Sequence, residues 1–150
     1  MRFALPALLL FSGVFLGQDR TVEPTWLRRD LSTAREHKTD LTTNSCRYLP
    51  LFGEGDTESR YPISVARFGQ LTISPGGECQ AVSYPRQEEI YFVRSGSGTL
   101  DFAGQAHPLV ANDFTYLPPG VVHSISNHPV WPAAALPRYP SARQVSAFAV

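Results

Sequence analysis

The part of the chain between residues 61 and 128 consists of short β-rich segments with a turn signal after nearly every one, and this pattern limits the fold most. Segments such as ISVARFGQLTIS, EIYFV and FTYL are rich in β-branched and aromatic residues, and they are separated by PGGE, RSGSG and PPG. Glycine and proline at these intervals favour turns over long helices. Short strands at this spacing are typical of an antiparallel sandwich or barrel. We therefore predict an all-β fold in one domain.

The charge of the chain is balanced, with 13 Lys and Arg residues against 13 Asp and Glu residues. No run of basic residues is present, so nothing in the charge pattern points to a nucleic-acid partner. The isolated arginines Arg67 and Arg94 are expected to face solvent.

The first 17 residues resemble a targeting segment. Arg2 is followed by an apolar run that ends at Leu16, which is too short to span a bilayer comfortably and fits the apolar core of a secretory signal. We predict a signal peptide over residues 1–17 and export to the periplasm or the extracellular space, with no membrane association after cleavage. An uncleaved N-terminal anchor is the alternative.

Two further segments flank the β-rich region of residues 61–128. Residues 18–60 form a polar, irregular arm, in which TWLRRDLSTAREHKTDL could form one short helix and residues 51–59 look like a loop. Residues 129–150 form a tail with four prolines, which exclude most of it from a central strand. Only QVSAFAV, at its end, could pair as a last strand.

Cys46 and Cys79 are the only cysteines. In an exported protein they could form a disulfide, and two separate buried thiols are the other reading, which we slightly prefer. The sequence alone does not show whether their Cα atoms come close enough for a bond.

A stretch near the end of the β-rich region, DFTYLPPGVVHSISN, carries the strongest chemical signal. Pro118, Pro119 and Gly120 form a rigid turn before a strand that contains His123 and Asn127. Side chains alternate along a strand, so these two residues share one face. If that face lies inside a barrel, the imidazole of His123 points into the cavity.

This stretch resembles the second conserved motif of the cupin superfamily, which reads Gly, five residues, Pro-x-Gly, two residues, His, three residues, Asn. Every position matches except the first, where Asn112 replaces the glycine. The first cupin motif reads Gly, five residues, His-x-His, three or four residues, Glu, six residues, Gly. Its spacing is kept by Gly77, Glu89 and Gly96, while the two histidine positions hold Ser83 and Pro85.

The resemblance implies a single cupin-like jelly-roll barrel, also called a double-stranded β-helix. Many cupins bind iron, manganese, nickel or zinc through three histidines and a glutamate, so Glu89 and His123 are the candidate metal ligands here. Two protein ligands rarely hold a catalytic metal; a serine hydroxyl is a poor ligand and a proline side chain has no donor. Cys79 is one further possible ligand. Cupins are often dimers, which implies a homodimer.

The predicted pocket contains Ser83, Tyr91 and Asn127 besides the two candidate ligands, within a set of aromatic residues. Three of these residues have a structural alternative: Glu89 could be a buried carboxylate bonded to Ser83, Tyr91 or His123, His123 could be a core histidine, and Asn127 could cap a strand end.

Two functions follow from the resemblance, and neither assigns catalytic residues. The first is an exported cupin-domain protein that binds a small sugar-like or aromatic molecule and has a degenerate metal site. The alternative is a metal-dependent isomerase or dioxygenase with an altered ligand set, in which Glu89 is a ligand or general base. A structural or assembly role is a third reading.

Overall fold

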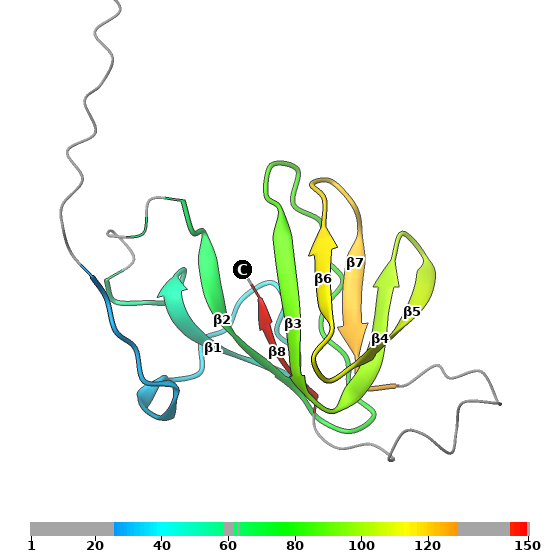
Figure 1. Cartoon of the computed structure of the whole chain (residues 1–150), viewed down its shortest axis with the longest axis horizontal. Helices are drawn as coiled ribbons and strands as arrows, with labels where there is room; N and C mark the ends of the chain where they lie inside the picture. Colours follow the sequence, from blue (N-terminus) through cyan, green and yellow to red (C-terminus); the bar gives the residue numbers. More distant parts are fainter. Residues whose placement is uncertain (1–25, 59–61, 63, 129–144, 150) are drawn as a thin grey trace, which may run out of the picture.

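The chain folds into two antiparallel β-sheets that curve around a common core (Figure 1). The computed structural model describes residues 26–58, 62, 64–128 and 145–149. One sheet has five strands in the order β1-β2-β8-β3-β6, and the other has three in the order β5-β4-β7. The strands are β1 (Cys46–Gly53), β2 (Arg67–Ile73), β3 (Glu89–Ser95), β4 (Ser97–Phe102), β5 (Gln105–Val110), β6 (Phe114–Leu117), β7 (His123–Ser126) and β8 (Val145–Ala149).

The core lies between the sheets and draws on both of them. Alternate residues of β3 are buried, as with Tyr91 and Val93, and β2 contributes Leu71 and Ile73. Burial of each such side chain stabilises the fold by roughly 1.5–3 kcal/mol. The core residues are Leu41, Cys46, Tyr48, Leu71, Ile73, Cys79, Tyr91, Val93, Leu100, Leu109, Leu117 and Ile125. The predicted all-β fold is confirmed, since the described residues contain strands, turns and a single short 3₁₀ helix but no α-helix.

Strand β1 corrects the prediction for residues 18–60. The sequence predicted a polar arm with a loop over residues 51–59, but Cys46–Gly53 is an edge strand paired antiparallel with β2. The register of this pairing shifts between Pro50 and Phe52, so the buried residues do not alternate regularly along the strand. Because the apolar residues do not alternate regularly, the sequence pattern did not predict this strand. A proline is tolerated here because the strand lies at the sheet edge.

The rest of the arm is irregular. The short helix expected within residues 25–41 is reduced to the 3₁₀ turn η1 (Leu31–Thr33), which begins at Asp30, whose side chain accepts a hydrogen bond from the Ser32 amide. Because η1 contains no buried residue, no packing extends it into a longer helix. None of the described residues form a helix long and apolar enough to cross a membrane.

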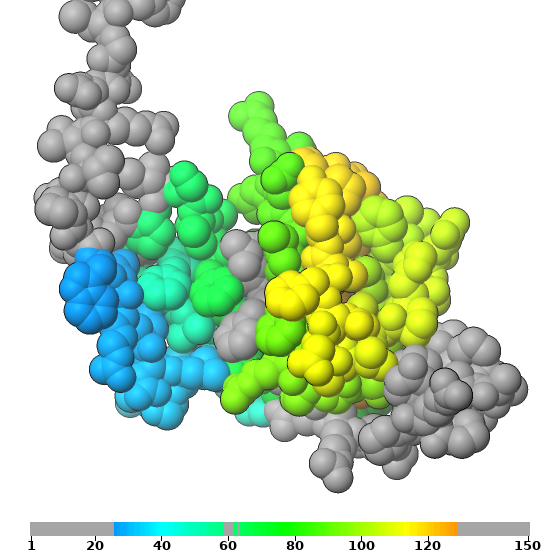
Figure 2. Space-filling view, in the orientation of Figure 1, coloured from blue at the N-terminus to red at the C-terminus, as the bar shows by residue number. Residues whose placement is uncertain are grey.

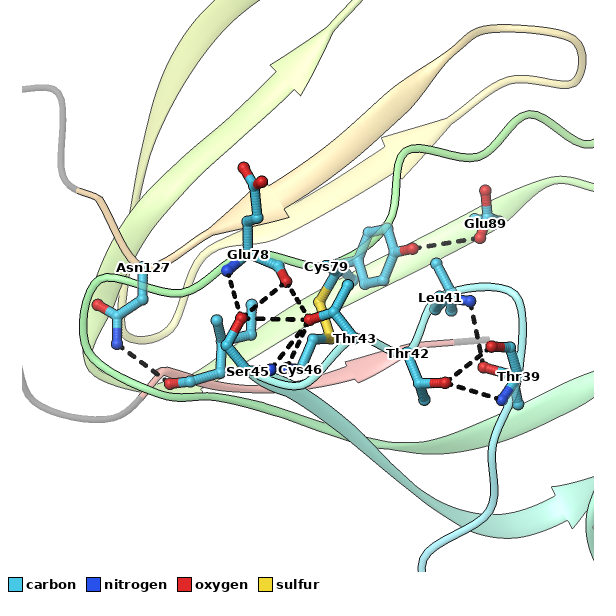
Figure 3. The surroundings of a disulfide bond; sticks show 12 residues. Thr39, Leu41, Thr42, Thr43, Ser45, Cys46, Glu78, Cys79, Glu89 and Asn127 are labelled. Carbon is cyan, nitrogen blue, oxygen red and sulfur yellow. Dashed lines mark hydrogen bonds between the residues drawn. A yellow bond between two sulfur atoms is a disulfide. The ribbon is translucent and has the colours of Figure 1, made fainter.

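Cys46 and Cys79 form a disulfide, so the preferred reading of two separate thiols was wrong (Figure 3). Their Cα atoms lie 5.0 Å apart, and 33 residues separate them in the sequence. Two backbone hydrogen bonds bring the segments together: the Ser74 amide donates to the Ser45 carbonyl, and the Gln80 amide donates to the Leu41 carbonyl. Such a pairing between distant segments leaves no local sequence signal.

Residues 1–25 and 129–144 lie outside the described part of the chain, so the predicted signal peptide and most of the proline-rich tail remain predictions. The last segment of the tail contains strand β8, which lies between β2 and β3 and pairs with both (Figure 1). The domain boundaries at residues 17 and 128 also remain predictions.

Candidate functional site

Glu89 and His123 come from opposite sheets and meet inside the barrel. Glu89 is the first residue of β3 and His123 is the first residue of β7, so each side chain enters from a different sheet. Nε2 of His123 lies 2.9 Å from Oε2 of Glu89, and the two residues are 2% and 7% exposed. The convergence expected of these two candidate ligands is therefore present in the structure.

The orientation of the His123 ring is fixed from its other side. Nδ1 lies 3.0 Å from the backbone oxygen of Val121, and because a carbonyl only accepts, Nδ1 is the donor. Nε2 then faces Glu89, although the two atoms are not aligned as a hydrogen bond. Burial lowers the pKa of His123, but the Glu89 carboxylate and the Val121 carbonyl outweigh it, and the net effect raises this pKa above its usual value.

Tyr91 completes this buried group. Its hydroxyl donates to Oε1 of Glu89 at 3.3 Å, and its ring meets that of His123 edge-on with centroids 6.1 Å apart. Burial and the adjacent Glu89 charge raise the pKa of Tyr91 well above its usual value, so the phenol stays protonated and keeps donating. Tyr91 thus contacts both Glu89 and His123, but it is not among the residues that line the adjacent pocket.

Ser83 does not join the site, because a β-bulge reverses the facing of its segment. Glu78 is bridged to Ser126, and Val82 is bridged to His123. Glu78 and Val82 are four positions apart, whereas their partners Ser126 and His123 are only three positions apart. The segment 78–82 therefore contains one extra residue between the two bridges. Beyond the bulge, Val82 packs against the core and Tyr84 is half-buried, whereas Ser83 and Pro85 are exposed.

Asn127 is buried but lies apart from Glu89. Its Nδ2 donates to the Ile73 carbonyl at 3.1 Å, and Figure 3 shows Asn127 and Glu89 on opposite sides of the disulfide. Asn127 shares a strand face with His123, but it lies four residues further along the chain, which corresponds to about 13 Å in an extended strand. The amide therefore bonds the backbone near a strand end, and it does not line the pocket with Glu89.

Sequence reasoning missed a second polar cluster, formed by Arg67, Asp40 and Tyr84. Arg67 was expected to face solvent but is 9% exposed. Its guanidinium donates to both carboxylate oxygens of Asp40, at 2.7 and 3.3 Å, and lies 4.9 Å from the centre of the Tyr84 ring. The Tyr84 hydroxyl also donates to Asp40 at 2.7 Å. These three residues come from distant parts of the chain, so no local sequence motif predicts the cluster.

A pocket of about 390 Å³ is lined by one residue from each cluster. Arg67 and Glu89 both line it, so a permanent cation and a carboxylate face the same space. The remaining lining residues are Ser64, Val65, Ala66, Arg86, Gln87, Glu88 and Pro119. A small molecule with both donor and acceptor groups fits this mixture of charges.

The described residues do not fit a metal ion held by three histidines and a glutamate. Among them no group of three or more His, Cys, Asp or Glu side chains could hold a metal. Glu89 and His123 remain a pair, since Cys79 is consumed by the disulfide and His107 packs against Phe102 on another strand. Two protein ligands are fewer than catalytic metal sites of this kind use.

Comparisons with known proteins agree with this architecture. A family model described as "Cupin domain" matches residues 69–136. No curated protein sequence matches the chain. One similar solved structure is a predicted oxalate decarboxylase from Thermotoga maritima, with a TM-score of 0.62, 17% identity, and coverage of 82% of this chain and 96% of that one.

Two further structures have the same fold. A polyketide cyclase from Streptomyces resistomycificus has a TM-score of 0.59 at 15% identity, and the match covers 83% of this chain and 78% of the cyclase. A Cupin 2 conserved barrel domain protein from Salinispora arenicola has a TM-score of 0.53 at 20% identity, covering 85% of this chain and 87% of its own. Identities this low establish the fold and leave the chemistry open.

Proposed function

The chain is a cupin-domain protein with a jelly-roll fold, and we propose that it binds a small polar molecule in the mouth of the barrel without needing a metal ion. The main support is the buried Glu89–His123 pair beside the 390 Å³ pocket, with no third ligand among the described residues. Glu89 supplies acceptor oxygens to the pocket and Arg67 supplies a cation. The similar structures carry the names of a decarboxylase and a cyclase, so similarity favours no single reaction.

The disulfide supports the proposal that this protein is exported. Disulfides persist in the periplasm and outside the cell, whereas the cytosol keeps thiols reduced. Cys46 and Cys79 are 0% and 4% exposed, so their bond is part of the core. Together with the apolar leader in residues 1–17, it favours a periplasmic or extracellular location.

Purified protein should contain no stoichiometric transition metal and should bind a small polar ligand in EDTA. We expect Glu89→Gln to weaken that binding about tenfold, because it removes the charge from the acceptor in the pocket. Ligand-observed NMR with a panel of polyols, carboxylic acids and aromatic amides, combined with elemental analysis, measures both properties. Glu78→Gln is the matched control, since Glu78 is exposed and outside the pocket lining.

The alternative is a metal-dependent isomerase or dioxygenase, and one observation favours it. The Nδ1 atom of His123 is held by the Val121 carbonyl, and Nε2 faces Glu89 without hydrogen-bond alignment. A metal-ligating histidine usually has its second nitrogen held in this way. Stoichiometric metal that disappears in His123→Ala would favour this alternative and contradict the metal-independent proposal.

A second copy of the chain is the partner that strand β6 favours. The strand lies at the edge of its sheet, in the yellow part of the surface that faces the viewer in Figure 2. Phe114 is 72% exposed and Tyr116 is 57% exposed. Unpaired edges and exposed aromatic side chains are features of association surfaces. We expect a homodimer by light scattering, and Phe114→Glu with Tyr116→Glu should give a monomer. Val122→Glu, at a residue equally exposed, should leave the mass unchanged; a monomeric wild type contradicts the assignment.

A further inference from the structure

Arg67 is a buried cation that needs an anionic partner. Its side chain is 10% exposed, and it stands at the start of β2, in the wall of the pocket. Removing the partner of a buried charge is strongly destabilising, because the charge can neither neutralise nor reach water. Two carboxylates are paired with it, those of Asp40 and Glu54, so Glu54 stays beside Arg67 when Asp40 is displaced.

Asp40, the carboxylate that accepts two hydrogen bonds from Arg67, is held much less firmly than Arg67 itself. The Asp40 side chain is 47% exposed and comes from the irregular arm, outside the sheet ladder. It is kept in place by two hydrogen bonds from Arg67 and one from the Tyr84 hydroxyl. If Asp40 left Arg67, water could solvate the Asp40 carboxylate. The free-energy cost of displacing Asp40 therefore comes mainly from the buried Arg67 guanidinium, which loses a hydrogen-bond acceptor.

We propose that Asp40 is an internal substitute for a ligand carboxylate, and that the pocket binds a small carboxylic acid that replaces Asp40 on Arg67. This inference rests on the proposed small-molecule function and names its ligand class. The planar fork of the guanidinium matches any carboxylate in the bidentate manner now seen with Asp40. The Tyr84 ring stays against the Arg67 guanidinium and helps to hold it in place.

The charges around the pocket favour a monoanion. Its lining contains two arginines and two glutamates, so one added negative charge that replaces Asp40 leaves the local balance unchanged. Glu54 also lies near Arg67, with its Oε2 3.5 Å from Nε. A dianion would place an uncompensated charge close to Glu54 and Glu89.

The test measures binding of sodium acetate and sodium benzoate by NMR, with the Arg67 side-chain Nε–H resonance as the reporter. Asp40→Asn should bind both acids about tenfold more tightly than the wild type, because a neutral amide competes less well for the guanidinium. Tyr84→Phe, which removes one of the bonds that hold Asp40, should give a smaller gain in the same direction. Glu36→Gln removes an exposed arm carboxylate that pairs with Arg47 and should change nothing.

Benzamide, which has the shape of benzoate without its charge, separates the possible outcomes. The proposal is overturned if Asp40→Asn and Tyr84→Phe both bind the acids no better than the wild type. It is also overturned if benzamide binds as tightly as benzoate, although the pocket then remains a small-molecule site. Pocket resonances that respond to none of the polar probes would contradict the proposed function itself.

Discussion

Replacing Val82 and Tyr84 together with histidine is expected to complete a four-ligand zinc site around Glu89 and His123. The bulge between the Glu78 and Val82 bridges turns these two side chains inward, and Val82 is paired directly with His123. The Tyr84 ring centroid is 6.3 Å from that of His123. Two added imidazoles would join His123 and Glu89, giving a four-ligand set that suits zinc. We expect Zn²⁺ affinity to rise about a hundredfold or more, measured by calorimetry in the absence of chelator.

The matched control places the same two histidines at Ser83 and Pro85. These positions satisfy the motif spacing, but both side chains are exposed, so they should leave Zn²⁺ affinity near that of the wild type. Cobalt absorption provides a second reading, because tetrahedral Co²⁺ absorbs far more strongly than hydrated Co²⁺. A gain in the Ser83 and Pro85 variant, with none in the Val82 and Tyr84 variant, would mean that the strand is regular and the bulge is absent.

This pair of variants also marks the limit of what motif spacing predicts. Spacing singled out Glu89 and His123, which the structure brings to 2.9 Å of each other, because each begins a strand whose neighbours follow the expected pattern of turns. It assigned Ser83 to the pocket because Ser83 occupies a histidine position of the first motif. The extra residue is visible only in the pairing of Val82 with His123, which depends on contacts between segments about 40 residues apart.

Arg67 was missed for a related reason. A lone arginine in a β-rich segment normally faces water, and its burial depends on Asp40, which lies 27 residues earlier in the chain. Strand β1, the disulfide and the Asp40 contact all depend on how the arm packs against the barrel. The sequence predicted the β-rich region well because its signals are local, and it predicted the arm poorly because the arm is ordered by long-range contacts.

Removing the disulfide should cost more stability than any other single change considered for this protein. Cross-linking residues that are 33 positions apart restricts the unfolded chain, and a loop of this length corresponds to about 4 kcal/mol. We expect Cys46→Ala with Cys79→Ala to lower the free energy of unfolding by roughly that amount, measured by urea denaturation. Because both sulfur-bearing side chains are buried, a mild reductant should act slowly on the native protein.

A matched control separates the cross-link from the hydrogen bonds that surround it. The Thr43 hydroxyl donates to the Glu78 carbonyl at 2.7 Å, and the Ser45 hydroxyl accepts from the Glu78 amide at 3.1 Å (Figure 3). Ser45→Ala removes the two hydrogen bonds between its hydroxyl and the Glu78 backbone and keeps the disulfide, and should cost about 1 kcal/mol for each hydrogen bond. An equal loss of stability in Ser45→Ala and in the double cysteine variant would contradict a separate role for the cross-link.

The same variants test whether the disulfide also positions Asp40. The cross-linked segment begins beside it, because the Leu41 carbonyl accepts from the Gln80 amide next to Cys79. Without the disulfide, hydrogen exchange at the amides of Gln80 and Cys46 should accelerate, whereas exchange within the β4–β7 pairing should change only as far as global stability falls. Looser anchoring of the arm weakens the hold of Asp40 on Arg67, so the cysteine variant should bind benzoate more tightly than the wild type. Unchanged benzoate affinity would show that Asp40 is held by Arg67 and Tyr84 alone.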